Sequence, residues 1–484
     1  MDDLIKTKEK PLVLVTLIEA GMGHIVSAVA IADALKAQYS DKVNVLEKYI
    51  LRESDNDVLQ KYEKFLVDNV KGYSKYSSFG YFQYFSMYIL GPQNSLKLVH
   101  NTVMRKQVNA LVDEYAKIKP DVIVTTHYFT LYCAVRYRNL YDNNVKVVCY
   151  CPDNNVHGWW DARADMIYTN NPMATQQAYD LTFRSGMVQE AFYPTRKAVT
   201  EANESKEFYR TKFGIPQDKF AVVVADGVYA EAKAKDICLE LIKSDLPLTV
   251  CLLAGKNDAM KREFDELKSK VKPNITLLTF GFMQNAPELY RACDLFITKA
   301  GPNAILDSVM VDTPVIVDFC ATPIEYTTKN LFTKHFNCGC FIASPKQIKI
   351  QVEEYIKHPE YLQKFAHSLA YFDKSKNGAD DIADDIVGLI FNGEQNRDKH
   401  YAQEDAVINR YFELKAEKCN SGYNKKLMQN GLSAKRQLKL NNKIALNKCK
   451  CENKAKALKS KFHSGKASKK YADILIKLSA DECV

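Results

Sequence analysis

Short apolar runs rich in β-branched residues alternate with longer segments of helical periodicity along most of this 484-residue chain. Residues 11–18 read PLVLVTLI, the glycine turn AGMGH follows, and residues 25–39 carry apolar side chains at helical spacing. Further short runs of the same kind are DVIVTTH, VKVVCYC, MIYTN, FAVVVADG, LTVCLLAG, ITLLTFG, LFITKAG and TPVIVDF. Strands that alternate with helices predict parallel, doubly wound α/β sheets.

The chain is longer than one hydrophobic core usually serves, so two folded domains are expected. A polar, proline-bracketed stretch at 194–218 separates two series of strands, and we therefore assign residues 1–195 to a first domain and residues 196–395 to a second. Residues 396–484 form a Lys- and Asn-rich extension with few large apolar residues. Its composition is compatible with disorder or with isolated amphipathic helices.

Charge is unevenly distributed between the tail and the rest of the chain. Residues 397–484 hold 21 Lys and Arg against 9 Asp and Glu, so the tail carries +12 and residues 1–396 carry −3 of the overall +9. The basic tail could attract an anionic membrane surface, and a solvated, inert extension is the alternative. Nucleic acid is not an expected partner, because aromatic side chains are sparse among the basic ones.

The 13 cysteines are scattered, and their close pairs are separated by one residue, which is typical neither of a secreted disulfide framework nor of a metal site. No run approaches the ~20 apolar residues that span a bilayer. The polar start MDDLIKTKEK lacks the apolar core of a signal peptide. We therefore expect reduced cysteines, no metal and a cytoplasmic location.

The strongest chemical signal lies in residues 281–317, which read as strand end, helix, strand, glycine loop, helix and strand. In open α/β sheets, ligands bind at the carboxyl ends of strands. The loop KAGPN at 299–303 would place backbone N–H groups and a helix N-terminus beneath an anion such as a diphosphate. Asp307, one turn further on, could accept hydrogen bonds from ribose hydroxyls; a plain helix cap with an exposed acid is the alternative.

The sequence KAGPNAILDSV resembles the KAGP-G-T-x-x-EA signature of monogalactosyldiacylglycerol synthases and processive diacylglycerol glucosyltransferases, in glycosyltransferase family 28, with MurG as a more distant relative. The similarity covers most of residues 11–390, including GFMQNAPELYRACDLFITKAG and PDVIVTTH, and does not reach the tail. It implies a GT-B fold, in which two Rossmann-like, doubly wound domains face each other across a cleft. The second domain would hold the nucleotide sugar and the first the acceptor, without a metal.

The resemblance also assigns residues to the donor UDP-sugar. A stretch PIEYTTKN is similar to the family's PGQExxN, and Asp307 stands where the family has Glu. The implied contacts are Phe282 and Met283 with the uracil, Lys299, Gly301, Pro302 and Asn303 with the diphosphate, Asp307 with the ribose, and Glu325 with the sugar, while Asn330 supports its loop.

The first glycine turn, EAGMGH, resembles the family's D-T-G-G-G-H and suggests where the base lies. An acceptor hydroxyl that attacks an anomeric carbon must lose its proton, and a histidine has a pKa near working pH for that role. We predict His24 as the base and Glu19 as its orienter or alternative. Without the resemblance, a His beside glycines reads as a polar group at a helix N-terminus.

Other residues are expected to shape the acceptor site in the first domain. Gly21 and Gly23 belong to the glycine turn, and His127 and Asp153 match the family's PDxIxxTH and TD positions. The alternative is a structural role, in which His127 and Asp153 form hydrogen bonds with backbone groups where strands end. In the aromatic segment 73–88, Tyr81, Phe82 and Phe85 could dip into a membrane interface, with a buried aromatic helix as the alternative.

The implied activity is inverting, metal-independent transfer of a hexose from UDP-glucose or UDP-galactose to diacylglycerol, without a further cofactor, on the cytosolic face of a membrane. This chain departs from the family at one place that matters for donor binding. Where the family has a glycine-rich loop, only Gly227 is found in the stretch AVVVADGVYAEAKAKD. Two alternatives therefore stay open. One is transfer to another membrane acceptor, such as an isoprenoid-linked or sterol-like lipid, and the other is a non-catalytic scaffold that binds lipid or nucleotide.

Overall fold

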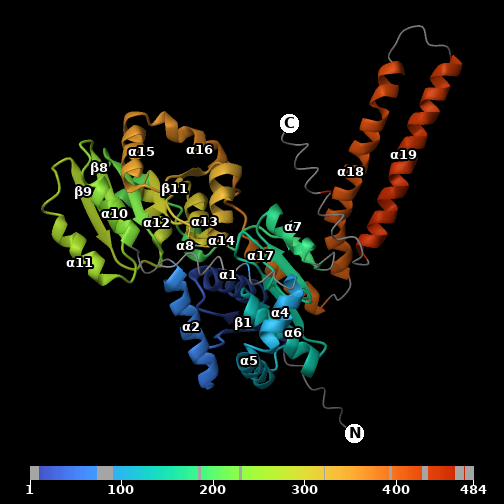
Figure 1. The fold of residues 1–484 in the computed structure, drawn as a ribbon, viewed down its shortest axis with the longest axis horizontal. Helices are drawn as coiled ribbons and strands as arrows, with labels where there is room; N and C mark the ends of the chain where they lie inside the picture. Colours follow the sequence, from blue (N-terminus) through green and yellow to red (C-terminus); the bar gives the residue numbers. More distant parts are fainter. Residues whose placement is uncertain are drawn as a thin grey trace.

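The computed structural model describes residues 10–73, 85, 91–181, 183, 187–227, 232–320, 322–391, 395–427, 434–463 and 474. They form two six-stranded parallel sheets with helices on their faces, followed by two long helices (Figure 1). The α/β class and the two doubly wound domains predicted from the alternating pattern are confirmed.

The first sheet has the strand order β2-β1-β3-β4-β5-β6. The chain order reverses between β1 and β3, and in such sheets the crevice outside this switch point is the usual ligand site. The elements are β1 (Leu12–Leu17), α1 (Met22–Tyr39), β2 (Asn44–Tyr49), α2 (Asp57–Tyr73), α4 (Pro92–Asn101), α5 (Arg105–Ile118), β3 (Val122–Thr125), α6 (Tyr128–Tyr141), β4 (Lys146–Tyr150), β5 (Met166–Thr169), α7 (Pro172–Asp180) and β6 (Val188–Glu190).

The second sheet has the order β12-β11-β10-β7-β8-β9, with its switch point between β7 and β10. Its elements are α8 (Lys197–Thr200), α9 (Lys206–Phe213), β7 (Phe220–Ala225), α10 (Ala232–Leu241), β8 (Leu248–Leu253), α11 (Asp258–Leu267), β9 (Ile275–Phe280), α12 (Ala286–Ala292), β10 (Leu295–Thr298), α13 (Pro302–Met310), β11 (Val315–Val317), α14 (Pro323–Asn330), the π-helical turn η1 (Leu331–His335), β12 (Gly339–Phe341), α15 (Pro345–Lys357) and α16 (Glu360–Tyr371).

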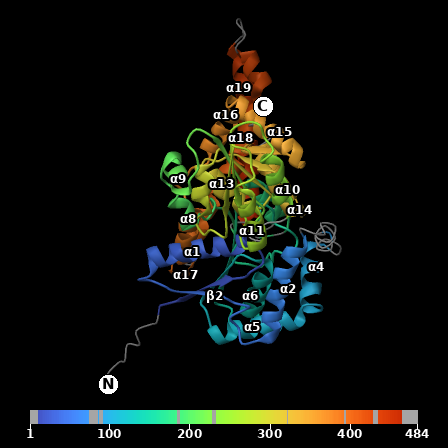
Figure 2. The same cartoon turned by 90° about the vertical axis from the view of Figure 1, so that its left-hand side faces the viewer.

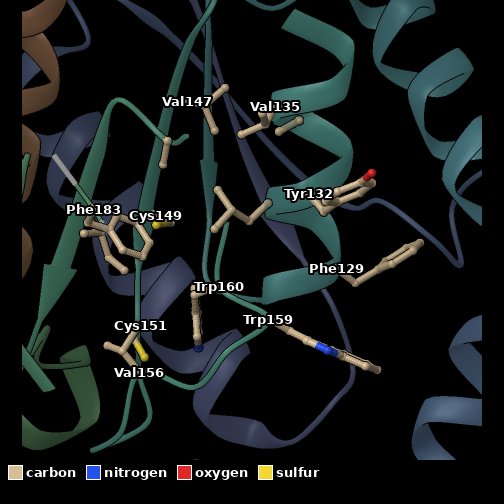
Figure 3. Close-up of a cluster of buried hydrophobic side chains, with 14 of the residues drawn as sticks. Phe129, Tyr132, Val135, Val147, Cys149, Cys151, Val156, Trp159, Trp160 and Phe183 are labelled. Atoms are coloured by element: carbon tan, nitrogen blue, oxygen red, sulfur yellow. The ribbon is translucent and has the colours of Figure 1, made fainter. Parts of the chain in front are cut away.

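In the first domain, Val135 of α6 and Val147 of β4 lie between helix and strand, and buried aromatic side chains of the same core surround the start of α6 and the loop that follows β4 (Figure 3). Trp160 is fully buried, and Trp159 is 6% exposed. Phe129 and Tyr132 reach this core from α6. Because large buried side chains fix the loop from below, the polar residues at its start are held at the carboxyl edge of the sheet.

Helix α17 (Gly378–Phe391) returns to the first domain, although it follows the last strand of the second. Its buried residues Ala379, Ile382, Ala383 and Ile386 share a core with β1 and α1. Their spacing is that of one helical face, which explains why the helix needs an apolar partner. The domain boundary at 395 drawn from the sequence therefore differs from the packing, in which the second domain ends before α17.

The tail forms two helices, α18 (Gln395–Leu427) and α19 (Ala434–His463), which lie side by side and project from the two-domain body (Figures 1 and 2). Their base packs on the first domain through Ile408, Phe412, Ala455 and Leu458. The described part of the tail is therefore an anchored helical pair, where the sequence also allowed disorder. Among the described helices, none is long and apolar enough to cross a membrane.

Candidate functional site

The loops at the carboxyl ends of the two sheets meet at the domain boundary. Gly23, in the first turn of α1, lies so near the Asn303 side chain of α13 that a Cβ atom would overlap it. The buried Asn154, after β4, donates a hydrogen bond from Nδ2 to Thr328 Oγ1 on α14 at 3.1 Å. The two switch points predicted to bind acceptor and donor therefore face each other.

His24 is held by two hydrogen bonds in the first turn of α1. Its Nδ1 lies 2.6 Å from the Thr126 carbonyl oxygen, and Thr126 Oγ1 donates to the His24 carbonyl at 2.7 Å. A carbonyl only accepts, so Nδ1 carries the proton and a neutral ring keeps its lone pair on Nε2. Gly21, with φ of 119°, makes the turn that starts this helix. The geometry gives His24 the tautomer that a general base needs.

Glu19 contacts two residues of its own domain. Its Oε2 lies 3.4 Å from Arg52 Nη1, and its backbone N–H donates to Glu63 Oε1 at 3.1 Å. The buried Glu63 carboxyl has a pKa raised by desolvation, which the hydrogen bond from Glu19 and the charge of Arg52 partly offset. Sequence reasoning missed Arg52 and Glu63, whose contacts with Glu19 hold the turn that leads to His24, in keeping with the predicted role of Glu19 as an orienter.

Charged groups from both domains gather around His24. Burial raises the pKa of the Asp153 carboxyl, the charge of His24 lowers it, and the charge of Glu325 across the boundary raises it. Glu325 Oε1 in turn pairs with Lys299 Nζ at 3.5 Å. Asp153 is therefore placed to stabilise a protonated His24, and Lys299 and Glu325 lie opposite it.

The N-terminus of α13 directly follows β10, as the sequence predicted for residues 299–303. Its N-cap is Gly301, Pro302 opens the first turn, and no described side chain caps it. The Oδ1 atom of Asn303 is buried and has no hydrogen-bond partner among the described residues. Free first-turn N–H groups and the nearby Lys299 make this end of the helix suitable for a diphosphate.

Asp307, one turn into α13, is ion-paired with Arg196, a residue that sequence reasoning missed. Arg196 Nη2 donates to Asp307 Oδ2 at 2.5 Å. Burial raises the pKa of the Asp307 carboxyl, and the guanidinium opposes this. Arg196 lies 111 residues away in the chain, and no local pattern marks it.

The remaining donor-site residues lie around this helix. Phe282 is 47% exposed after β9, with Lys256 Nζ 5.6 Å from its ring centre, and Met283 packs on the second core. Asn330 ends α14, and its Oδ1 is buried without a described partner. Phe282 is thus the exposed member of this predicted set, and Met283 and Asn330 are partly buried, so their contacts with a donor stay predictions.

His127 caps helix α6, because its Nδ1 accepts from the Phe129 N–H at 3.2 Å. Burial first, and then the charges of His24, His157 and His100, lower its pKa well below the usual range. Its ring meets that of His24 edge to face at 4.9 Å. The structure thus shows that His127 caps a helix and contacts His24, and its role in shaping the acceptor site stays a prediction.

Two sequence features lie wholly or partly outside the described residues. Of the aromatic segment, Tyr81 and Phe82 fall outside, while Phe85 is 68% exposed. In the glycine-poor loop after β7, Gly227 has a φ of 78° and lies next to the Lys299 side chain. Lys233, at the start of α10, donates to the Asp318 carbonyl. The described part of this loop is therefore bordered by two lysine side chains, those of Lys299 and Lys233.

Two doubly wound domains whose switch points face each other, one with a fixed histidine and one with an uncapped helix N-terminus, have the architecture of the GT-B fold and of its glycosyltransferases. Models of known families agree with both halves. "Monogalactosyldiacylglycerol (MGDG) synthase" matches residues 24–195, and "Glycosyltransferase family 28 C-terminal domain" matches residues 229–335. Each α/β domain thus matches a model of the family that its motifs resemble, the first that of monogalactosyldiacylglycerol synthases and the second that of the C-terminal domain of glycosyltransferase family 28.

Individual relatives show how far the similarity reaches. A processive diacylglycerol β-glucosyltransferase of Bacillus pumilus is 22% identical over 386 residues, covering 79% of this chain and 96% of the relative. Monogalactosyldiacylglycerol synthase 2 of Arabidopsis thaliana is 23% identical over 400 residues, covering 75% of this chain and 80% of the relative. The structure of Acinetobacter baumannii MurG, at 11% identity, aligns with a TM-score of 0.50 over 78% of this chain and 99% of MurG, which supports the fold.

Proposed function

We propose that this protein transfers a hexose from UDP-glucose or UDP-galactose to diacylglycerol, with inversion and without a metal. The observation that carries the proposal is the pairing of His24, whose Nδ1 proton is fixed on Thr126, with the uncapped N-terminus of α13 across the boundary. The names of the relatives support the substrate class, because both act on diacylglycerol or make a glycosylated form of it.

In the proposed reaction, Nε2 of His24 takes the proton of the acceptor hydroxyl as the oxygen bonds to the anomeric carbon. The bond from that carbon to the diphosphate breaks, and UDP leaves with the electron pair. Asp153 stabilises the imidazolium, and Lys299 with the N–H groups of α13 stabilises the charge on UDP. Glu325 would release Lys299 to the diphosphate and turn to the sugar hydroxyls.

We further propose that the protein works at the cytosolic face of an anionic membrane. Phe85 offers an exposed aromatic ring, and four exposed lysines lie on one face of α19. These lysines are Lys439, Lys443, Lys450 and Lys454. Their spacing of four and seven residues repeats one helical face, and each cation near an anionic surface contributes about 1 kcal/mol.

The test is UDP release by the purified protein on diacylglycerol-containing vesicles, with UDP-glucose, UDP-galactose and UDP-N-acetylglucosamine offered separately. Lipid-dependent release with one donor, lost in His24→Ala, is the expected result. Extraction and mass analysis of the lipid product identify the acceptor. UDP binding without release from any donor would contradict the transferase and favour the non-catalytic scaffold.

A further inference from the structure

The chain crosses from the first domain to the second after β6 and returns ahead of α17, and these two crossings are hydrogen-bonded to each other. The Gly378 N–H donates to the Tyr193 carbonyl at 3.2 Å, and the Thr195 N–H donates to Asn377 Oδ1 at 2.8 Å. A Cβ at Gly378 would overlap the Phe192 carbonyl, so only glycine permits this approach. The two crossings therefore form one connected unit between the domains.

Arg196 extends from this unit into the donor half of the site. Its Nη2 donates to Asp307 Oδ2 at 2.5 Å, and its Nη1 donates to the Gln284 carbonyl at 3.1 Å. Asp307 belongs to α13 and Gln284 to the loop after β9, which also carries Phe282. One guanidinium thus joins the predicted ribose and uracil elements to the domain crossing.

The ion pair leaves Asp307 with one oxygen for a ligand. Its side chain is 5% exposed, and its Oδ1 is buried and makes no hydrogen bond of full geometry among the described residues. The Tyr193 hydroxyl lies close enough to help lower the pKa of this carboxyl, so a ribose hydroxyl would bind beside it. A carboxylate whose second oxygen is fixed by a guanidinium has its remaining lone pairs in a set direction. Without that cation, a buried carboxyl favours its protonated form, which is a poorer acceptor.

We infer that Arg196 is a positioning residue that orients Asp307 toward the donor ribose and couples nucleotide binding to the crossing between the domains. This inference rests on the proposed UDP-sugar donor. Because a site built to accept a hydroxyl's hydrogen bond rejects an analogue that lacks it, Arg196 should set the preference for ribose over deoxyribose. It should also make the crossing respond when a nucleotide binds.

The first measurement is calorimetric binding of UDP and 2′-deoxy-UDP to wild type, Arg196→Gln and Arg196→Lys. Wild type should bind UDP roughly tenfold more tightly than the deoxy form, the effect of one hydrogen bond to a charged group. In Arg196→Gln, UDP affinity should fall by about tenfold and the two affinities should converge, while Arg196→Lys should recover part of the difference.

Arg210→Gln is the matched control. Arg210 is also buried and pairs with a carboxylate, Asp294, at 2.7 Å, but Asp294 precedes β10 and so lies at the opposite edge of the sheet. This variant should lose stability and keep the preference for UDP over its deoxy form. Equal loss of preference in both variants would show a general packing effect and overturn the inference.

Hydrogen exchange gives a second readout of the coupling. UDP should slow exchange of the amides of residues 372–378 in wild type, and should do so much less in Arg196→Gln at saturating UDP. An unchanged affinity ratio and unchanged protection in Arg196→Gln would overturn the inference and leave the proposed function intact. Failure of wild type to bind UDP at all would overturn the proposed function itself, and this inference with it.

Discussion

The side-chain amide of Asn303 lies against Gly23 across the domain boundary, where a Cβ atom would overlap it. The two residues open the helices that carry the predicted diphosphate site and the predicted base. Gly23 is therefore needed for space, whereas Gly21, with φ of 119°, is needed for backbone conformation. Their contact fixes how near acceptor and donor helices approach.

Gly23→Ala should lower kcat/KM by roughly tenfold, which is about 1.4 kcal/mol of transition-state stabilisation. The added methyl group pushes on the flexible end of Asn303, so each domain should still fold. Vesicle-based kinetics and thermal unfolding measure the two effects. Gly422→Ala is the control, because a Cβ there meets nothing within 4 Å; equal kinetics for both variants and wild type would contradict the prediction.

His24→Ala should lower kcat by about 10²–10⁴-fold with little change in donor affinity, as expected for loss of a general base. Glu19→Gln should cost much less, since Glu19 pairs with Arg52 and only supports the turn. Single-turnover rates distinguish the two. If Glu19→Gln is the more damaging variant, or if both variants remain fully active, the assignment of the base is wrong.

Glu325→Gln should change the preference between UDP-glucose and UDP-galactose more than it changes binding of UDP. The Glu325 carboxylate pairs with Lys299 of the predicted diphosphate site and lies near Asp153 of the predicted acceptor site, and we propose that the sugar contacts it there. Competition between the two donors gives the ratio of kcat/KM values. Asp373→Asn, remote on the surface, serves as control, and an unaltered ratio in Glu325→Gln would remove that residue from sugar recognition.

Acid should destabilise the first domain through its buried histidines. Burial lowers the pKa of His100 from 6.5 to about 4 and that of His157 to about 3. Between these values and 6.5 the unfolded chain binds more protons than the folded one. The free energy of unfolding should therefore fall as pH falls below about 6.5, by up to about 1.4 kcal/mol per pH unit for each histidine.

His100→Phe should make that pH dependence shallower between pH 6.5 and 4.5. His100 packs on Phe129, Tyr132 and Trp159, and its Nδ1 bonds to the Leu96 carbonyl. The charge of Asp161 opposes the burial effect and is unchanged in the variant. Urea unfolding at several pH values measures the free energy of unfolding as a function of pH. The control His358→Ala, at an exposed position, should keep the wild-type pH dependence. If the pH dependence of His100→Phe parallels that of wild type, His100 does not contribute to it.

Replacing the four lysines of the α19 face by glutamine should weaken binding to vesicles that contain anionic lipid. Each charge contributes about 1 kcal/mol, so partitioning should fall by more than tenfold at low salt and hardly at all on neutral vesicles. Glutamine at Glu413 and Glu417 of α18 is the opposite-sign control and should not weaken binding. Tighter binding to RNA than to anionic vesicles would point to another partner.

Local patterns identified most of the architecture. Strand and helix periodicity predicted β1, β3, β4, β5 and β7 to β11, and the KAGPN loop was correctly placed between β10 and α13. The edge strands β2, β6 and β12 were not predicted from local pattern, and neither was the return of α17 to the first domain. The three residues of β6 or of β12 are too few to show a period, and in β2 polar and apolar residues do not alternate. The apolar face of α17 predicts that the helix packs on something but does not identify the element it packs on.

By itself, the sequence determined the α/β class, the two switch-point loops and the family, because these depend on periodicity and on contiguous motifs. Only the tertiary structure showed that Glu19 forms an ion pair with Arg52, that His127 caps a helix, and that Arg196 forms an ion pair with Asp307. Hydrogen bonds and ion pairs between residues far apart in the chain depend on how elements pack. Packing depends on the whole chain, whereas turns and helix starts are determined by a few neighbouring residues.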